Sequence, residues 1–169
     1  IFREGLQLDQ QAFSRFLTNE EITHLHATPA FLMNLQNLNL SNLKRVIAGG
    51  DVCNWELRDN WNESLEFYNE YGPTETTVTS IEYLDKFNEG HRLNSIPIGK
   101  PIDNCRIYIT GANSNLCPIG VPGEIWIGGV QVARGYLNRE ELTSEKFGRD
   151  PFSSDLEARV YRTGDLGRW

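Results

Sequence analysis

The residues of this sequence that could do chemistry are densest between Tyr68 and Thr77, which reads YNEYGPTETT. A predicted strand end runs there into Gly72 and a proline, followed by hydroxyl side chains such as Thr74 around the carboxylate of Glu75. Backbone N–H groups and hydroxyls can donate hydrogen bonds to phosphate oxygens, and a carboxylate is a hard ligand for the Mg²⁺ that accompanies ATP. Tyr71 adds a flat face for a base. A Thr-capped turn with Glu75 at a helix N-terminus fits the composition equally well.

Three further segments carry weaker signals. Gly49 and Gly50 follow a short apolar run, and two glycines let backbone approach a ligand at the carboxyl end of a strand, although a tight turn also explains them. In 161–166 (YRTGDL), Asp165 follows a Thr-Gly turn and could accept both hydroxyls of a ribose, while a surface turn is the plainer interpretation. The segment 123–137 is a glycine-bounded strand, which predicts an architectural role.

Composition and charge exclude several classes of function. Sixteen Lys and Arg against 23 Asp and Glu give a net charge of −7 without a basic stripe, so we expect no nucleic-acid partner. No stretch approaches the ~20 apolar residues that cross a bilayer, which predicts a cytoplasmic protein without a membrane segment. Three dispersed cysteines without a CxxC pair favour neither a disulfide framework nor a zinc site. The only histidines, His24, His26 and His91, show no metal-ligand or hydrolase spacing.

The elements that must position these residues alternate in type in the first half. Apolar periodicity, caps and turn residues predict helices over 8–17, 30–37 and 55–61 and strands over 22–27, 43–48 and 65–68. Thr28 is the expected cap of the second helix, and Pro29 its first residue. The alternation predicts an α/β fold with a partly parallel sheet.

After about residue 85 the pattern changes to short strands between glycine, proline and asparagine turns. Strands are expected over 105–109, 123–127 and 158–162. One helix is expected over 139–147, with Gly148 as its C-terminal stop. The second half is therefore predicted to be a small, mostly antiparallel β-subdomain.

Taken in order, these segments resemble the adenylation domains of nonribosomal peptide synthetases, within the superfamily of acyl-adenylate-forming enzymes. Residues 69–75 look like the family's NxYGPTE signature, and 161–166 look like its YRTGDL. The segment 123–137 is similar to GELxIxGxxVARGYL, with Trp126 in place of leucine. The segment 96–101 (IPIGKP) looks like the amino-acid-activating branch rather than the CoA-ligase branch.

The resemblance implies a fold and a reaction. The fold is α/β, part of an adenylate-forming N-terminal lobe, with an α/β sheet subdomain over 1–85 followed by a small distorted β-barrel subdomain over 86–169. The reaction is ATP-dependent formation of aminoacyl-AMP with release of pyrophosphate, followed by capture on the phosphopantetheine thiol of a peptidyl carrier domain. Such chemistry needs positioning and charge neutralisation more than proton transfer. The implied cofactors are ATP and Mg²⁺, and the implied partners are an amino acid, the carrier domain and neighbouring modules of secondary-metabolite synthesis.

The resemblance also implies roles for single residues. Tyr71 would stack on adenine, Asn69 would bond the base and Glu75 would coordinate Mg²⁺. Thr74 would face the phosphate and the substrate carboxylate, and Asp165 would bind the ribose.

Fixed offsets from the family's motifs imply a pocket around the substrate side chain, formed by His26, Ile47, Gly49, Glu70, Val78 and Thr79. A buried Glu70 needs a partner, which suggests a polar or cationic substrate side chain that donates to Glu70 or shares a network with His26. Alternatively, His26 and Glu70 satisfy one another or the backbone and recognise nothing. The amino acid activated, the peptide product and the flanking modules stay open.

Other segments of such enzymes are not in this sequence: a Gly-, Ser- and Thr-rich phosphate loop ending in lysine, an aspartate motif for the substrate amine, and a C-terminal lobe with its catalytic lysine. We therefore expect an internal piece of a longer protein, inactive alone. An acyl- or aryl-CoA ligase of the same superfamily is the first alternative. A non-catalytic ATP-binding scaffold is the second.

Overall fold

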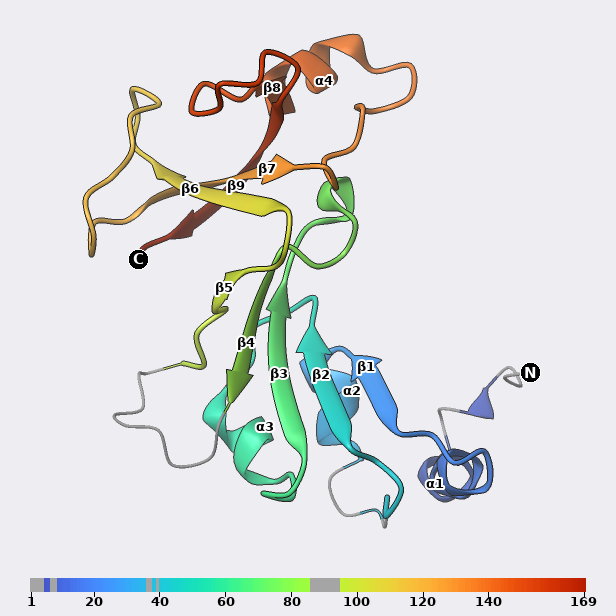
Figure 1. Ribbon diagram of the computed structural model, residues 1–169. Helices are drawn as coiled ribbons and strands as arrows, with labels where there is room; N and C mark the ends of the chain where they lie inside the picture. Colours follow the sequence, from blue (N-terminus) through green and yellow to red (C-terminus); the bar gives the residue numbers. More distant parts are fainter. Residues whose placement is uncertain (1–4, 7–8, 36–37, 39, 86–94) are drawn as a thin grey trace. The chain divides into compact units, whose positions relative to one another are not determined.

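A computed structural model of the chain describes residues 5–6, 9–35, 38, 40–85 and 95–169 (Figure 1). The chain divides into two compact units that alternate along the sequence. The first unit comprises residues 1–71 and 82–99, and the second comprises 72–81 and 100–169. The division expected between residues 85 and 86 falls at the edge of 86–94, which lie outside the described residues.

The helices of the first unit are α1 (Gln10–Asn19), α2 (Pro29–Met33) and α3 (Trp55–Asp59). Each begins after a side chain that accepts a hydrogen bond from a backbone N–H three residues later. The three caps are Asp9, Thr28 and Asn54. These bonds satisfy donors that a helix N-terminus leaves without intrahelical partners, so the helix starts are encoded locally. The predicted limits Leu8 and Asn37 lie outside the described part of the chain, as does His91.

The first sheet has the strand order β1 (His24–Ala27), β2 (Arg45–Gly49), β3 (Glu66–Tyr71), β4 (Ile81–Asp85) and β5 (Lys100–Pro101). Strands β1, β2 and β3 are parallel, which confirms the partly parallel sheet expected from the sequence. Their register sets His26 beside Ile47, and Gly49 beside Glu70. The carboxyl ends of these three strands therefore share one edge, where the last side chains of each strand can meet (Figure 1).

The core of the first unit lies between the helices and the sheet. Leu32 of α2, Val46 of β2 and Phe67 of β3 have no solvent exposure. Phe13 of α1 packs edge-on against Phe31 of α2, with ring centroids 5.6 Å apart. Burial of apolar area of this kind is the main stabilising contribution to such a layer.

The second unit contains an antiparallel sheet with the order β6-β7-β9-β8. Its strands are β6 (Cys105–Thr110), β7 (Gly123–Gly129), β8 (Phe147–Arg149) and β9 (Arg159–Gly167), and its helices are α4 (Glu140–Lys146) and the one-turn η2 (Thr74–Thr76). Ile127 and Val160 are fully buried between the strands. The predicted α/β class is thus confirmed, with one mixed and one antiparallel sheet.

The helix predicted over 139–147 is confirmed as α4, which ends at Lys146 with Phe147 as its C-cap, directly before Gly148. Gly148 itself lies in β8, opposite Val160. One local prediction for the second unit is wrong. The expected turn at Thr163 and Gly164 is instead an irregularity inside β9.

No helix among the residues that the structure describes is long and apolar enough to cross a membrane.

Candidate active site: a carboxylate loop and a strand edge

The loop of residues 72–80 is tightly constrained. It contains η2, after which Thr77 and Val78 both adopt positive φ, 60° and 68°. A β-carbon added to Gly72 would lie 2.4 Å from the carbonyl oxygen of Val78, so only glycine fits at this position. Consecutive non-glycine residues with positive φ are strained and persist only where their surroundings hold them. Val78 is exposed and Thr79 is half-buried.

Glu75 lies at the centre of this loop and is fixed through both its main chain and its side chain. The hydroxyl of Tyr136 donates to Glu75 Oε1 at 2.5 Å. The backbone N–H of Ala133 donates to the Glu75 carbonyl at 2.8 Å. The Tyr136 hydroxyl also lies 3.3 Å from that of Tyr161. The carboxylate is therefore oriented by groups more than fifty residues away along the chain.

The surroundings of Glu75 favour its ionised form. Partial burial acts to raise the pKa of the carboxyl group, but hydrogen bonds from Tyr136, the backbone and Tyr161, with the positive charge of Lys146, bring the pKa below its ordinary value. Burial and the neighbouring carboxylate raise the pKa of Tyr136 far above its ordinary value. At neutral pH the pair is thus a carboxylate and a neutral phenol.

The hydroxyl groups around Glu75 differ in what they contact. Thr76 is fully buried; its hydroxyl donates to the carbonyl of Pro73 at 3.2 Å and accepts from Ser80 at 2.8 Å. Thr77 donates to the carbonyl of Gln131 at 3.0 Å. Thr74 is exposed. Thr74 therefore differs from Thr76 and Thr77, whose hydroxyls donate to backbone carbonyl groups of the fold.

A second group of predicted residues meets at the carboxyl edge of the parallel strands. His26 Nε2 on β1 lies 3.8 Å from Glu70 Oε2 on β3. Gly49 on β2 lies between them, and a β-carbon there would come within 2.8 Å of His26 Nε2. The side chain of Glu70 is 14% exposed and that of His26 is 41% exposed. The missing side chain of Gly49 thus permits the approach of His26 to Glu70.

The remaining predicted residues of the first unit lie on the same strands. Asn69 is buried, and its Nδ2 donates to the carbonyl oxygen of Pro97 at 2.9 Å. A base amine would therefore donate its hydrogen bond to Asn69 Oδ1. Tyr71 and Ile47 are half-buried, and Gly50 has a φ of 84°.

Asp165 is exposed by the irregularity in β9. Strand β7 pairs Glu124 with Leu166 and Trp126 with Arg162, so residues 163–165 of β9 form an excursion opposite a single residue. The hydroxyl of Thr163 donates to the carbonyl of Ile125 at 2.8 Å and accepts from the backbone N–H of Asp165 at 2.9 Å. A carboxylate on a fixed bulge is suited to accept hydrogen bonds from paired hydroxyls.

The donor set fits a Mg²⁺ ion shared with a nucleotide. In the described ranges, no three His, Cys, Asp or Glu side chains gather as an all-protein metal cage. Mg²⁺ commonly takes only one or two protein carboxylates and completes its shell with phosphate oxygens and water. A single ionised carboxylate held in place, as Glu75 is, matches that pattern.

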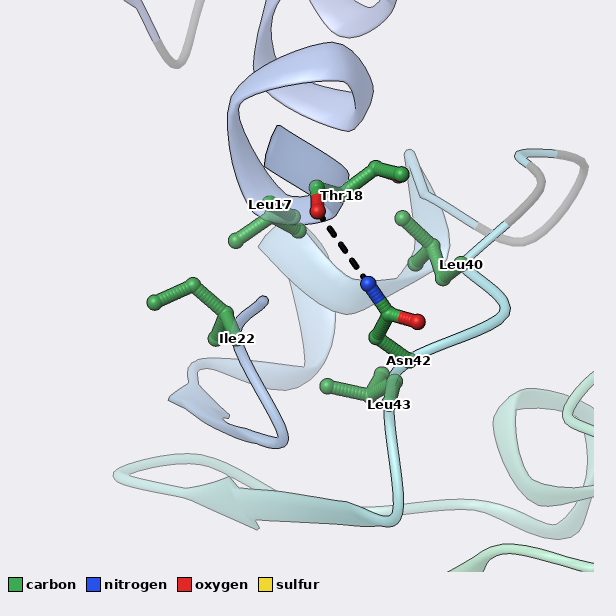
Figure 2. Close-up of a pocket in the computed structure, with 6 residues that line it drawn as sticks. All are labelled: Leu17, Thr18, Ile22, Leu40, Asn42 and Leu43. Atoms are coloured by element: carbon green, nitrogen blue, oxygen red, sulfur yellow. Dashed lines mark hydrogen bonds between the residues drawn. The ribbon is translucent and has the colours of Figure 1, made fainter. Parts of the chain in front are cut away.

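A small hollow in the first unit offers no comparable chemistry (Figure 2). It is lined by Leu17, Thr18, Ile22, Leu40, Asn42 and Leu43. Its drawn hydrogen bond, from Asn42 Nδ2 to the Thr18 carbonyl at 3.1 Å, joins two lining residues. We therefore assign no ligand to this hollow.

Comparison with known proteins agrees with this arrangement. The sequence model of the family described as AMP-binding enzyme matches residues 1–137. The chain belongs to the AMP-binding enzyme family. It is 39% identical to malpinin synthetase of Mortierella alpina over 175 residues, which cover 100% of the chain and 2% of the synthetase. It is also 39% identical to tyrocidine synthase 3 of Brevibacillus parabrevis over 179 residues, 100% of the chain and 3% of that protein.

Solved structures lead to the same family. The AMP-binding chain superposes on the nonribosomal peptide synthetase FmoA3 with a TM-score of 0.84 and 28% identity, over 99% of the chain and 18% of FmoA3. An NRPS protein containing adenylation and PCP domains gives a TM-score of 0.85 and 25% identity, over 95% of the chain and 34% of that protein. The chain therefore spans only a small part of the relatives that it matches.

The sequence did not reveal four residues around Glu75 in this AMP-binding chain. Tyr136 lies in a segment interpreted as architectural, and Tyr161, Thr143 and Lys146 carried no assigned role. Tyr136 and Tyr161 each belong to a family-like motif, which is the one signal that could have drawn attention to them.

Proposed function

We propose that the chain is part of an amino-acid-activating adenylation domain. In the intact protein this domain would form aminoacyl-AMP from an amino acid and ATP, release pyrophosphate, and transfer the aminoacyl group to the phosphopantetheine thiol of a carrier domain. The observation that carries the proposal is the fixed, ionised Glu75 in a YGPTE loop of an AMP-binding chain. The similarity to proteins named as peptide synthetases, and to one with adenylation and PCP domains, supports the amino-acid branch.

The residues of the second unit would act on the phosphates and the ribose. Glu75 would hold Mg²⁺, which when bound neutralises charge on the phosphate oxygens during displacement of pyrophosphate. Thr74, exposed beside it, would donate to the α-phosphate or to the substrate carboxylate. Asp165 would accept the ribose hydroxyls from its place on the bulge of β9. Gly72 would give the loop its close turn.

The residues of the first unit would receive the base and the amino acid. Tyr71 would stack on adenine, and Asn69 would accept a hydrogen bond from its amine through Oδ1. The backbone at Gly49 and Gly50 would approach the nucleotide. A β-carbon at Gly49 would lie 2.8 Å from His26 Nε2, whereas the nearest atom to one at Gly50 would be Thr28 Cγ2, at 3.9 Å.

The substrate side chain would be polar or cationic. His26, Ile47, Gly49 and Glu70 of the first unit would contact it. Glu70 is mostly buried, and its carboxylate lies 3.8 Å from His26 Nε2. A substrate side chain with a hydrogen-bond donor or a positive charge would complement the negative charge of Glu70 at this edge.

The test is amino-acid-dependent exchange of pyrophosphate into ATP by the complete domain that contains the chain. The panel should include Asn, Asp, Ser, Orn, Lys, Arg, apolar amino acids and simple aryl acids. Exchange with one polar or cationic amino acid, abolished by Glu75→Ala, is the expected result. Exchange confined to Leu, Val or Phe would contradict the assigned substrate class. Exchange only with acids that are not amino acids would move the protein to the acyl- or aryl-CoA ligases.

A further inference from the structure

We propose that Tyr136 is a positioning residue for the metal-binding carboxylate: its phenol holds Glu75 through one oxygen and so presets the other for a Mg²⁺·nucleotide. This inference rests on the proposed function, because it takes Glu75 as the metal ligand. It gives Tyr136 a role in the site, whereas the sequence of its segment predicts only an architectural role.

Two contacts of Glu75 come from one short segment of the second unit, and Tyr161 adds a further hydrogen bond. Tyr136 donates to Glu75 Oε1 at 2.5 Å, and Ala133 donates from its backbone N–H to the Glu75 carbonyl at 2.8 Å. The hydroxyl of Thr77 donates to the carbonyl of Gln131, two residues before Ala133, at 3.0 Å. Residues 131–136 therefore hold the loop by its backbone and hold its carboxylate separately. The phenol bonds to the carboxylate itself, so the orientation of that group is the effect that we assign to it.

Tyr136 is itself held rigidly. Its backbone N–H donates to Thr143 Oγ1 at 2.9 Å, and Thr143 Oγ1 donates to its carbonyl at 3.4 Å. The preceding Gly135 has a φ of 144°, and a β-carbon there would come 2.4 Å from the Thr143 methyl carbon. The Tyr136 ring packs edge-on against Phe147 at 5.4 Å between centroids. A phenol fixed in this way holds its hydroxyl in one place without further ordering when a ligand binds.

The chemistry of the pair suits a metal ligand. A hydrogen-bond donor on one carboxylate oxygen fixes the plane of the group and leaves the lone pairs of the second oxygen for a cation. Partners that orient ligating groups in this way typically contribute 10–100-fold to metal affinity. A neutral phenol orients the carboxylate without cancelling the negative charge that attracts Mg²⁺, which a lysine in the same place would do.

The second unit offers a matched control. The hydroxyl of Tyr108 also donates to a carboxylate, Oδ2 of the fully buried Asp150, at 3.0 Å. Tyr108→Phe and Tyr136→Phe therefore remove the same group from the same kind of bond in one sheet unit. Only the second change touches Glu75.

The experiment compares Mn²⁺ binding by the intact domain and its two variants, in the presence of α,β-methylene-ATP, from the electron paramagnetic resonance signal of free Mn²⁺. We expect Tyr136→Phe to weaken Mn²⁺ binding by roughly 10–100-fold and Tyr108→Phe to leave it unchanged. In pyrophosphate exchange, Tyr136→Phe should need a correspondingly higher Mg²⁺ concentration and should approach the wild-type rate when Mg²⁺ is saturating. A role confined to folding would lower the amount of active protein without moving the Mg²⁺ dependence.

Two outcomes separate this inference from the function on which it rests. Equal Mn²⁺ affinity of wild type and Tyr136→Phe, with exchange intact, would overturn the role of Tyr136 alone. If the wild type neither binds Mn²⁺ nor catalyses exchange, the proposed function and this inference are both overturned. If Tyr136→Phe does not fold, Thr143→Val replaces it, since that change removes both side-chain bonds to the Tyr136 backbone. Thr143→Val should then weaken Mn²⁺ binding several-fold, and an unchanged affinity would contradict the proposal.

Discussion

Arg58 on α3 is completely buried and donates from Nε to Asp85 Oδ2 on β4 at 2.5 Å. Its guanidinium also lies over the ring of Phe67, 5.2 Å from the centroid, and donates from Nη1 to the Trp61 carbonyl at 3.5 Å. The ion pair thus joins a helix and a strand that lie 27 residues apart along the sequence. Removal of one partner would leave a charge buried without its counter-charge.

We therefore expect Asp85→Ala to lower the free energy of unfolding by about 3–5 kcal/mol. The double change Arg58→Met with Asp85→Leu should lose much less, because it removes both charges and retains volume. Urea unfolding of the intact domain measures both. Glu66→Ala, which breaks the exposed pair with Arg45, is the control and should cost at most about 1 kcal/mol. A double variant as unstable as Asp85→Ala would show that packing, rather than the buried charge, sets the loss.

Gly49→Ala should impair the proposed amino-acid site more than the fold. The new β-carbon would lie 2.8 Å from His26 Nε2, and the ring of His26 can move because it is 41% exposed. We expect the KM for the amino acid to rise by roughly tenfold, about 1.4 kcal/mol of binding, with a change in unfolding free energy below about 1 kcal/mol. Amino-acid-dependent exchange and urea unfolding measure the two quantities.

The control for this change is the same substitution in a His26→Ala background. If the alanine acts by displacing His26, it should have almost no further effect once the imidazole is gone. A full additional rise in KM would instead mean that the methyl group blocks the substrate directly.

Gly99 and Gly120 form a matched pair for the second stability prediction. Both have positive φ, 98° and 83°, but a β-carbon at Gly99 would lie 1.8 Å from the Glu82 carbonyl oxygen, whereas none of the described atoms lies within 4 Å at Gly120. Gly120→Ala should cost only the strain of the backbone conformation, roughly 1–2 kcal/mol. Gly99→Ala should cost at least about 2 kcal/mol more, because backbone must move. Similar midpoints in thermal unfolding would contradict the steric account.

Cys53 should make stability depend on alkaline pH. The thiol is buried, and burial raises its pKa well above the ordinary value, to about 11. The folded state favours the protonated thiol. The contribution of Cys53 to the free energy of unfolding is therefore fully present below pH 9 and is lost as the pH rises towards 11. Unfolding free energy should therefore fall across that window in the wild type, and less so in Cys53→Ala. Cys117→Ala, at a half-buried thiol, should keep the wild-type slope.

Local signals in the sequence predicted much of the first unit. Thr28 and Pro29 fixed the start of α2 because a cap and an N-terminal proline act within a few residues. Strand β4 was not assigned, although Ile81 is buried and Glu82 exposed in the alternation typical of a strand. The end of α4 was predicted to within one residue, because Gly148 directly follows the C-cap Phe147.

The residue types in the sequence pointed to the candidate site, but the contacts between these residues could not be predicted from it. Glu75 stood out through the residue types around it, whereas the bond from Tyr136 joins residues 61 positions apart. This contact forms only when the loop that carries Glu75 folds against the segment that follows β7. The periodicity of a single sequence does not predict such a long-range contact. The pairing of His26 with Glu70 likewise required the register of β1, β2 and β3.

The interleaving of the two units has a consequence for protein engineering. Residues 72–81 belong with 100–169, although first-unit residues flank them on both sides. A graft of 1–71 and 82–99 from a relative would therefore replace His26, Ile47, Gly49 and Glu70 while the host kept Val78, Thr79 and Glu75. A single cut in the sequence would divide a folded unit, so an exchange of the first unit alone has to leave the short insert 72–81 in the host.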